Sequence, residues 1–144
     1  DASKTSISWA RENADISSLT NKPVRWIVED VQKYVKREIK RGNKYHGVVL
    51  DPPSYGRGPK GDVWKIEEHL FGLLDDIKEI LDENYSFLQL SAHSQGYTPI
   101  ALENIISDIV RPNSGKLTSF EMCLTPREGD KKLPVGACAL YERN

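Results

Sequence analysis

This sequence has little cysteine, no long apolar run and no excess of charge of one sign. The 144 residues include two cysteines, Cys123 and Cys138, in no CxxC or zinc-ligand pattern, which excludes a disulfide framework and favours a reducing compartment. The 20 basic and 21 acidic side chains give a net charge of -1, so any nucleic-acid site is a local patch. No stretch reaches the ~18 apolar residues of a membrane span, and no signal peptide opens the chain. We therefore expect a soluble, cytoplasmic protein without a membrane partner, of one domain or part of one.

Aromatic side chains compensate for a modest apolar content. Hydrophobic residues make up 38% of the chain, but 3 Trp, 6 Tyr and 3 Phe supply large side chains for a core, so we expect the chain to fold. Hydrophobic periodicity, caps and turn residues predict where its elements lie. Helices are predicted within residues 1–15 (with Ser3 as N-cap), at 31–41 (with a narrow apolar stripe that includes Tyr34, and stopped by Gly42), at 66–80 (with a longer apolar stripe) and at 98–110 (with Thr98 as N-cap). Strands are predicted at 24–28, 46–50, 86–90, 117–124 and 133–141.

The order of these elements predicts an α/β domain. Strands that alternate with helices form a mostly parallel sheet flanked by helices. Residues 46–50 are nearly all apolar, as is typical of parallel strands buried on both faces. The last two strands, joined by a charged connection, are expected to end the fold as an antiparallel pair.

Acidic residues follow two of the predicted strands and begin the chain. Ligands of open α/β sheets bind beyond the carboxyl ends of the strands. Asp1 precedes the first helix, Glu29 and Asp30 follow residues 24–28, and Asp51 follows residues 46–50. A carboxylate at such a place can accept hydrogen bonds from a ribose diol or from the exocyclic amine of an adenine. The alternative for Asp1 and Asp30 is that each caps the helix that follows it.

The segment Asp51-Pro52-Pro53-Ser54-Tyr55 is a more specific signal. Two successive prolines fix the backbone and remove two donors, which gives a rigid corner with carbonyl groups available to a ligand. An aromatic side chain just beyond, Tyr55, can stack on a planar base. The combination is suited to holding a nucleobase. The alternative is a stiff connection that carries a surface tyrosine.

Asp-Pro-Pro followed closely by an aromatic residue resembles the fourth motif of Rossmann-like S-adenosylmethionine-dependent methyltransferases that modify nucleic-acid bases. Residues 1–13 (DASKTSISWAREN), 28–31 (VEDV) and 44–54 (KYHGVVLDPPS) are similar to the bacterial large-subunit ribosomal RNA methyltransferases, closely over about residues 1–90 and loosely beyond. The resemblance implies a class I, Rossmann-like fold and S-adenosylmethionine as cofactor. It implies that Asp1 and the adjacent Ala2 bind the cofactor ribose, that Asp30 and Val31 hold the adenine, and that Asp51, Pro52 and Pro53, with Ser54 and Tyr55, lie beside the methyl group and the target base.

One departure from this family concerns the start of the domain. The family's first motif, a strand that runs into a Gly-rich turn, is absent from the sequence. In the family's strand order, 3-2-1-4-5-7-6, the first two strands lie between those predicted here at 24–28 and 46–50. We therefore expect residues 1–144 to be the C-terminal part of a single methyltransferase domain.

A second departure concerns the chemistry. Cytosine-5 methylation needs a thiolate that adds to the ring, and related enzymes carry it just after the strand predicted here at 86–90. This chain has Ser91-Ala92-His93-Ser94 there, and Cys123 and Cys138 are expected to be core residues on late strands. Cytosine-5 chemistry is therefore disfavoured, whereas direct attack by a base nitrogen, or by another nucleophile, remains open.

Histidines and basic residues complete the set of candidates. His93 is either a proton acceptor near the target or a surface histidine, and His46 and His69 share no metal-ligand spacing with it, so no metal site is expected. Arg57, Lys60 and Lys65 flank the proline corner and are suited to phosphate contacts. The denser charge run between Lys33 and Lys44 is more typical of a solvated helix face. Trp64 either braces the loop or joins the core.

These patterns favour one function and leave two alternatives. The leading hypothesis is an S-adenosylmethionine-dependent methyltransferase that acts on RNA, specifically ribosomal RNA. The first alternative is an RNA-binding or assembly module that kept the fold without catalysis. The second is a methyltransferase of small molecules or proteins.

Overall fold

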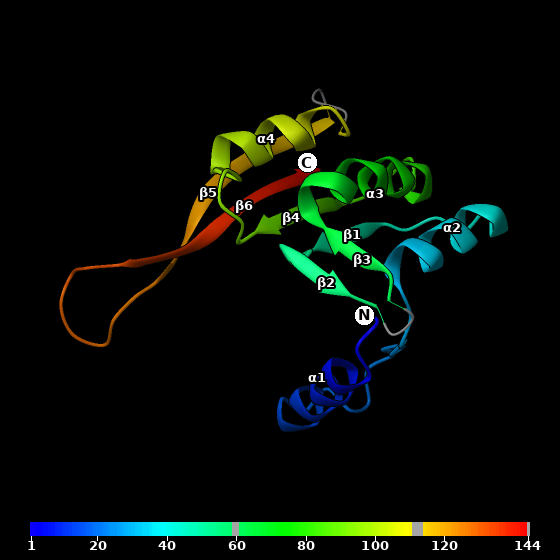
Figure 1. Ribbon diagram of the computed structural model, residues 1–144, viewed down its shortest axis with the longest axis horizontal. Helices are drawn as coiled ribbons and strands as arrows, with labels where there is room; N and C mark the ends of the chain where they lie inside the picture. The colour runs from blue at the N-terminus through cyan, green and yellow to red at the C-terminus, as the bar shows by residue number, and fades with distance from the viewer. Residues whose placement is uncertain (59–60, 111–113, 144) are drawn as a thin grey trace.

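The computed structural model describes residues 1–58, 61–110 and 114–143. Its elements alternate much as the sequence predicts (Figure 1). The helices are α1 (Lys4–Ile16), α2 (Val31–Arg41), α3 (Ile66–Ile80) and α4 (Pro99–Ser107); the strands are β1 (Gly47–Leu50), β2 (Tyr55–Arg57), β3 (Val63–Lys65), β4 (Phe87–Ala92), β5 (Gly115–Leu124) and β6 (Leu133–Arg143).

The main sheet has the order β1-β4-β6-β5. β1 and β4 pair in parallel, with Leu50 opposite Leu90, so their carboxyl ends meet at one edge. β6 runs antiparallel to both β4 and β5. The predicted α/β fold with a parallel core, flanking helices and a closing antiparallel pair is therefore confirmed. The order also matches the last four strands, 4-5-7-6, of the order implied by the resemblance.

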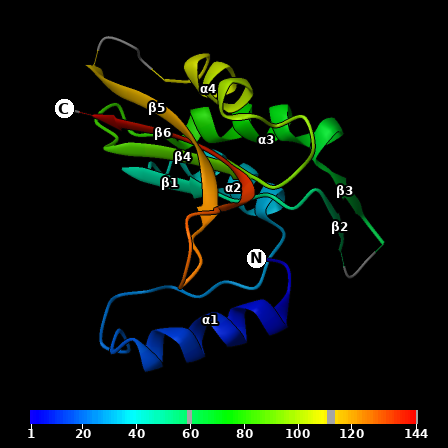
Figure 2. The ribbon, with the colours of Figure 1, turned by 90° about the vertical axis from the view of Figure 1, so that its left-hand side faces the viewer.

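The core lies between this sheet and α3 and α4, which run along one side of it (Figure 2). The predicted apolar stripe of α3 is buried, and α4 packs against β5 and β6. α2 packs against α3. α1 lies apart from the sheet in both views and has no buried residue. No helix in the described ranges is both long and apolar enough to cross a membrane.

The predicted caps form as the residue types require. Ser3 accepts a hydrogen bond from the backbone N–H of Ser6, and Thr98 accepts one from Ala101, so both close the first turn of a helix. Gly42 ends α2 at a φ of 68°, a left-handed conformation that glycine adopts without the steric cost of a Cβ.

A buried carboxylate fastens the end of α2 to the segment before β1. Glu38 is 3% exposed and accepts hydrogen bonds from Tyr45 (2.7 Å), Asn43 (2.7 Å) and Arg41 (2.9 Å). The bonds from Tyr45 and Asn43, with a smaller contribution from Arg41, lower the pKa of Glu38 from 4.5 to about 2 against the opposing effect of burial. Burial raises the pKa of Tyr45, which therefore stays a donor. The charged form of Glu38 thus stabilises the fold.

The Glu38 carboxylate predicts a specific acid sensitivity. A carboxyl group whose pKa is lower in the folded than in the unfolded chain contributes stability above the unfolded pKa and loses it as the pH falls towards the folded one. Glu38→Gln should therefore be less stable than the parent at pH 7, and the two free energies of unfolding should converge between about pH 4.5 and 2. Urea denaturation at a series of pH values measures this, with Glu12→Gln on the exposed face of α1 as control. A constant difference between Glu38→Gln and parent over that range would contradict the role.

Residues 24–28 do not form the predicted strand; they run extended without a ladder. Their interstrand bonding is one pair with Asp1: the Asp1 nitrogen donates to Ile27 (3.4 Å) and Glu29 donates to Asp1 (3.0 Å). These two bonds have the parallel pattern with Asp1 opposite Val28, but one such pair does not make a strand. An extended segment becomes a strand only where a neighbour pairs with it repeatedly.

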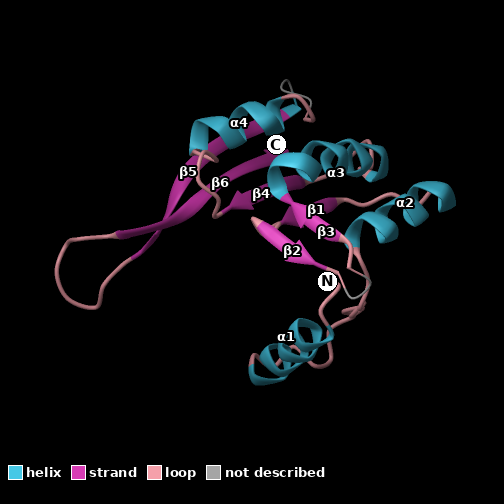
Figure 3. Cartoon of the chain, viewed as in Figure 1, coloured by secondary structure: helices cyan, strands magenta, loops and turns pink. Residues whose placement is uncertain are grey.

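The proline- and glycine-rich stretch contains a hairpin that the sequence did not predict. β2 and β3 are three residues each and pair antiparallel, with Gly56 opposite Trp64. The two hairpin strands have only three residues each, too few to show an alternation of apolar and polar side chains, which explains why the sequence did not predict them. Further differences are small: α4 ends at Ser107 rather than at 110, and β5 begins two residues earlier and β6 ends two residues later than predicted. These added residues pair at the end of the sheet away from the arm that β5 and β6 form (Figure 3).

Candidate active site

A surface hollow lies between residues 24–31 and the helices α1 and α2. Its volume is about 250 Å³. Of the residues predicted to bind the cofactor, Asp1 and Val31 line it, Ala2 and Asp30 are adjacent in sequence and do not, and Asp51 lies outside it. We call it the first hollow; its walls are Asp1, Ile7, Arg25, Trp26, Ile27, Glu29, Val31 and Tyr34.

Local hydrogen bonds hold Asp1 at the wall of the first hollow. Its backbone is fixed by the pair with Ile27 and Glu29 described above. Its Oδ1 accepts from the backbone N–H of Ser3 at 2.7 Å. Asp1 therefore does not cap α1, because Ser3 does, and the alternative prediction of a capping Asp1 is wrong.

Asp30 does cap a helix. Its Oδ1 accepts from the backbone N–H of Lys33 at 3.0 Å, which makes it the N-cap of α2. The alternative predicted for Asp30 is thus confirmed. The bond fixes the direction of the carboxylate at the start of the helix that forms one side of the first hollow.

Tyr34 is a part of the first hollow that sequence reasoning missed, and it lies near Glu29, one of the two acidic residues singled out after residues 24–28. Glu29 binds the Arg37 guanidinium through both oxygens, with one contact of 2.7 Å. The hydrogen bond from Arg37 is the main reason that the pKa of Glu29 is lowered. The same guanidinium lies 5.5 Å from the centre of the Tyr34 ring. The phenol of Tyr34 is 2.8 Å from that of Tyr45, which bonds Glu38, so a chain of contacts orients the ring. The sequence places Tyr34 on the apolar stripe of residues 31–41, a pattern that predicts burial but does not predict a place in the wall of the first hollow.

The Asp51–Tyr55 corner lies where β1 ends, with its carboxylate outward. Asp51 is 58% exposed, and its Oδ1 accepts from the hydroxyl of Ser91 at 2.7 Å. His93 Nε2 is 3.3 Å from the same oxygen. Ser91 and His93 belong to the end of β4 and the loop after it, beside β1 in the sheet. The parallel register therefore places both at the carboxylate.

The rest of the corner is braced from β3 and the loop after β4. Trp64 Nε1 donates to the Pro53 carbonyl at 2.8 Å, so the predicted freedom of the corner's carbonyls does not hold at Pro53. Trp64 also packs against the core, so it both braces the loop and joins the core, the two roles that the sequence left open. Ile66 N–H donates to the Ser54 carbonyl (3.1 Å), and the Ser94 hydroxyl donates to that of Ser54 (2.6 Å). These bonds hold the corner in one shape.

Tyr55, predicted to stack on a base, is half exposed at 50%. Arg57 Nε donates to its hydroxyl at 2.7 Å, and the guanidinium lies 6.0 Å from its ring centre. Of the other basic residues predicted to contact phosphates, Lys65 is paired with Glu68 at 2.7 Å, and Lys60 lies outside the described residues. Arg57 and Lys65 are thus both exposed, and each donates to a neighbouring side chain, Tyr55 and Glu68.

The basic helix α2 uses much of its charge for structure. Lys33 pairs with Asp62 (2.9 Å), Arg37 with Glu29, and Lys44 beyond the helix donates to the Glu79 carbonyl (2.6 Å). These contacts support the prediction of a solvated, structural face over that of an RNA-binding ribbon.

Neither cysteine lies at the position of a nucleophile. Cys138 is buried at 1% as predicted, and burial, with a smaller effect of the Asp51 charge, raises the pKa of its thiol. Cys123 is exposed, so its prediction as a core residue is wrong. It follows a register shift in β5, where the strand enters the projecting arm. Among the described residues no group of three or more His, Cys, Asp or Glu could hold a metal ion.

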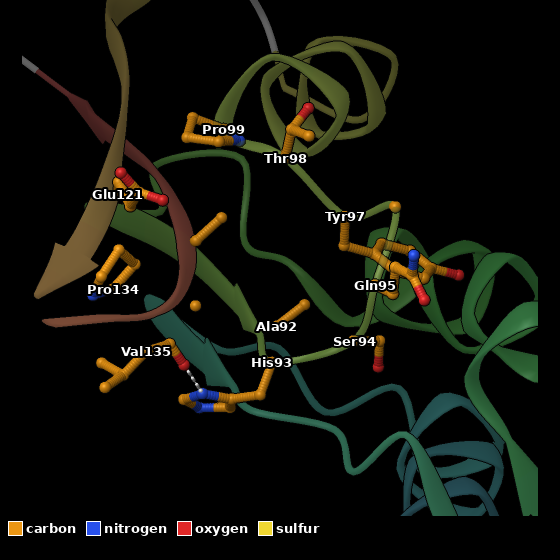
Figure 4. A pocket seen from close by; sticks show the side chains of 13 residues that line it. Ala92, His93, Ser94, Gln95, Tyr97, Thr98, Pro99, Glu121, Pro134 and Val135 are labelled. Atoms are coloured by element: carbon orange, nitrogen blue, oxygen red, sulfur yellow. Dashed lines mark hydrogen bonds between the residues drawn. The ribbon is translucent and has the colours of Figure 1, made fainter.

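A second hollow, of about 430 Å³, opens beyond the end of β4 (Figure 4). Its walls come from the loop after β4, the start of α4, and β5 and β6. His93 lies at its lower rim, with Tyr97 and Gln95 on one side and Glu121 across from them. Asp51 lines neither hollow, but its partner His93 and Ser94, which bonds Ser54, both line the second.

Comparison with known proteins gives relatives for the fold and for parts of the sequence. A solved structure of an S-adenosylmethionine-dependent methyltransferase from Agrobacterium tumefaciens has a TM-score of 0.88 and 33% identity over 99% of this chain and 47% of its own. Ribosomal RNA large subunit methyltransferase I of Aeromonas salmonicida is 34% identical over 55 residues, 38% of this chain and 14% of its own length. Ribosomal RNA large subunit methyltransferase K of Neisseria meningitidis is 26% identical over 82 residues, 56% of this chain and 23% of its own. No protein-family model matches the sequence. The chain thus spans less than half the length of each of these relatives.

Proposed function

We propose that this chain, which resembles class I S-adenosylmethionine-dependent methyltransferases, is the C-terminal part of one methyltransferase domain and contributes to methylation of a base in ribosomal RNA. One observation carries the proposal. Asp51, expected at the reacting methyl, follows β1 at the carboxyl edge of a sheet whose fold matches that of such an enzyme at a TM-score of 0.88.

The first hollow has the groups that the nucleoside end of the cofactor needs. The Asp1 carboxylate can accept from both ribose hydroxyls, and the Tyr34 ring and Val31 offer apolar surface to the adenine. The Asp30 carboxylate, fixed as the cap of α2, would accept a hydrogen bond from the adenine amine. The backbone N–H of Val31 would donate one to the adenine ring. Ala2, which has no bulky side chain, leaves room beside Asp1.

The Asp51–Tyr55 corner is the site proposed for the reacting groups. When bound, the cofactor supplies an electrophilic methyl on a sulfonium, and the attacking atom must lie nearly in line with it. Asp51 would accept a hydrogen bond from the target base, Tyr55 would stack on it, and Pro52, Pro53 and Ser54 would keep both in place. The bonds from Trp64 and Ser94 supply that stiffness.

Two relatives are named as ribosomal RNA methyltransferases, which favours RNA as the substrate of this chain. Arg57 beside Tyr55, with Lys60 and Lys65, would add contacts to phosphates. No cysteine stands at the end of β4 or just after it, where Ser91 bonds Asp51, so cytosine-5 chemistry stays disfavoured and direct attack by a base nitrogen, or by another nucleophile, stays open.

Incubation of the complete enzyme with methyl-labelled S-adenosylmethionine and unmodified ribosomal RNA tests this function. We expect label in the RNA, in a nucleoside other than 5-methylcytidine, identified by digestion and mass spectrometry. Protein and small-molecule fractions of the same cell extract serve as parallel substrates. Label in those fractions alone would contradict an RNA substrate, and RNA binding without any transfer would support the non-catalytic alternative.

A further inference from the structure

The Asp51 carboxylate is held through one of its two oxygens. Ser91, itself 5% exposed, donates to Oδ1 at 2.7 Å, and His93 Nε2 lies 3.3 Å from the same atom. Neither contact uses Oδ2. Because the side chain is 58% exposed, Oδ2 is accessible from the carboxyl edge of the sheet. Two groups therefore fix the orientation of a carboxylate that stays accessible.

His93 lies in a seat that the backbone of β6 provides. Its Nδ1 is 2.5 Å from the Val135 carbonyl, and because a carbonyl only accepts, Nδ1 carries the hydrogen (Figure 4). Nε2 is then the atom that faces Asp51, and it carries a hydrogen towards the carboxylate only in the imidazolium form.

Gly136 leaves room for this seat. A Cβ at Gly136 would lie 2.8 Å from His93 Nδ1 and 2.7 Å from the Ala92 carbonyl, and its φ of 153° is one that side chains disfavour. The imidazole is thus held on both sides: by β6 and by Asp51.

The second hollow begins at the other side of the same histidine. Its wall carries polar groups of Gln95, Thr98 and Glu121 beside the Tyr97 ring, so it offers acceptors, donors and an aromatic surface to a planar polar molecule. Ser94 in this wall bonds Ser54 of the proline corner. The Ser94–Ser54 bond and the His93–Asp51 contact therefore join the second hollow to the corner.

We propose that the second hollow receives the methyl-accepting base and that His93 is a positioning residue, which sets the Asp51 carboxylate with Oδ2 towards that base; this rests on the proposed methyltransferase function. The acceptor class is a nitrogen heterocycle whose attacking nitrogen carries a hydrogen. In the reaction the nitrogen–carbon bond forms while the carbon–sulfur bond breaks, with its electron pair left on sulfur. The nitrogen loses its proton to Asp51 Oδ2, which passes it to water.

Substitution of His93 tests the positioning role in the complete enzyme. We expect His93→Ala to lower kcat by about 10- to 100-fold, the worth of one hydrogen bond to a charged group, with the KM for S-adenosylmethionine unchanged. His93→Gln, whose amide can donate to Asp51, should restore most of kcat. His46→Ala is the matched control, because His46 is 74% exposed at the opposite end of β1. Thermal unfolding of each variant checks that it folds.

Gln95→Trp tests the hollow. An indole there should raise the KM for RNA at least 10-fold and leave cofactor affinity unchanged. Full activity of His93→Ala, an equal loss in His93→Gln, or an unchanged KM for RNA in Gln95→Trp would overturn the inference while the methyltransferase function stands. No transfer to any RNA by the parent enzyme would overturn both.

Discussion

Asp51→Ala is expected to lower the rate of methyl transfer by at least about 100-fold, or about 2.7 kcal/mol of transition-state stabilisation. The side chain is exposed, so its loss does not open a cavity in the core. It removes the acceptor that the proposed mechanism places at the target nitrogen, and it frees Ser91 and His93. Single-turnover rates with labelled cofactor measure the effect.

Two comparisons separate this loss from a general one. The affinity for S-adenosylhomocysteine, measured by calorimetry, should change by no more than a few-fold, because Asp51 lines neither hollow. Asp75→Ala, an exposed carboxylate on α3, should leave the rate unchanged. Asp51→Asn keeps an oxygen for Ser91 but loses the charge, and we expect it to stay as slow as Asp51→Ala. Retained activity in Asp51→Ala would remove the corner from the mechanism.

Asp1→Ala is expected to weaken cofactor binding by about 100-fold. Two ribose hydroxyls would donate to this carboxylate, and hydrogen bonds to a charged group contribute about 1.5–3 kcal/mol. Calorimetric titration with S-adenosylhomocysteine measures the change in Kd. The rate at saturating cofactor should fall much less, which distinguishes Asp1 from Asp51.

The local role of Asp1 needs its own control. Its Oδ1 also accepts from Ser3, so part of the loss in Asp1→Ala could come from the start of α1. Asp1→Asn keeps that acceptor and lacks the negative charge. We expect it to fold as the parent does and still to bind the cofactor at least 10-fold more weakly. Parent-like affinity in Asp1→Asn would assign the effect to the helix start instead of the ribose.

Local signals in the sequence were sufficient for most helices and for the position of the corner. Ser3, Asp30 and Thr98 cap where their side chains predict it, and Gly42 stops α2, because capping depends on a few adjacent residues. The order of the last four strands was expected from the resemblance alone, because the composition of a strand does not predict which strand lies beside it.

Contacts between distant residues were out of reach of sequence reasoning. Ser91 bonds Asp51 across 40 positions, and His93 bonds Val135 across 42. No periodicity encodes such pairs; the register of β1 against β4 and of β4 against β6 creates them. The residues 24–28 show the converse, since their β-rich composition does not produce a strand without repeated pairing.

The central claim is that one bound cofactor reaches from the hollow at Asp1 to the corner at Asp51. A crystal structure of the complete enzyme with S-adenosylhomocysteine tests it most directly. The proposed function predicts the adenosine in the first hollow, with its ribose at Asp1, its base between Val31 and Tyr34, and the sulfur directed to Asp51. Adenosine bound in the second hollow, beside Tyr97 and Glu121, or a sulfur that points away from Asp51 would contradict it.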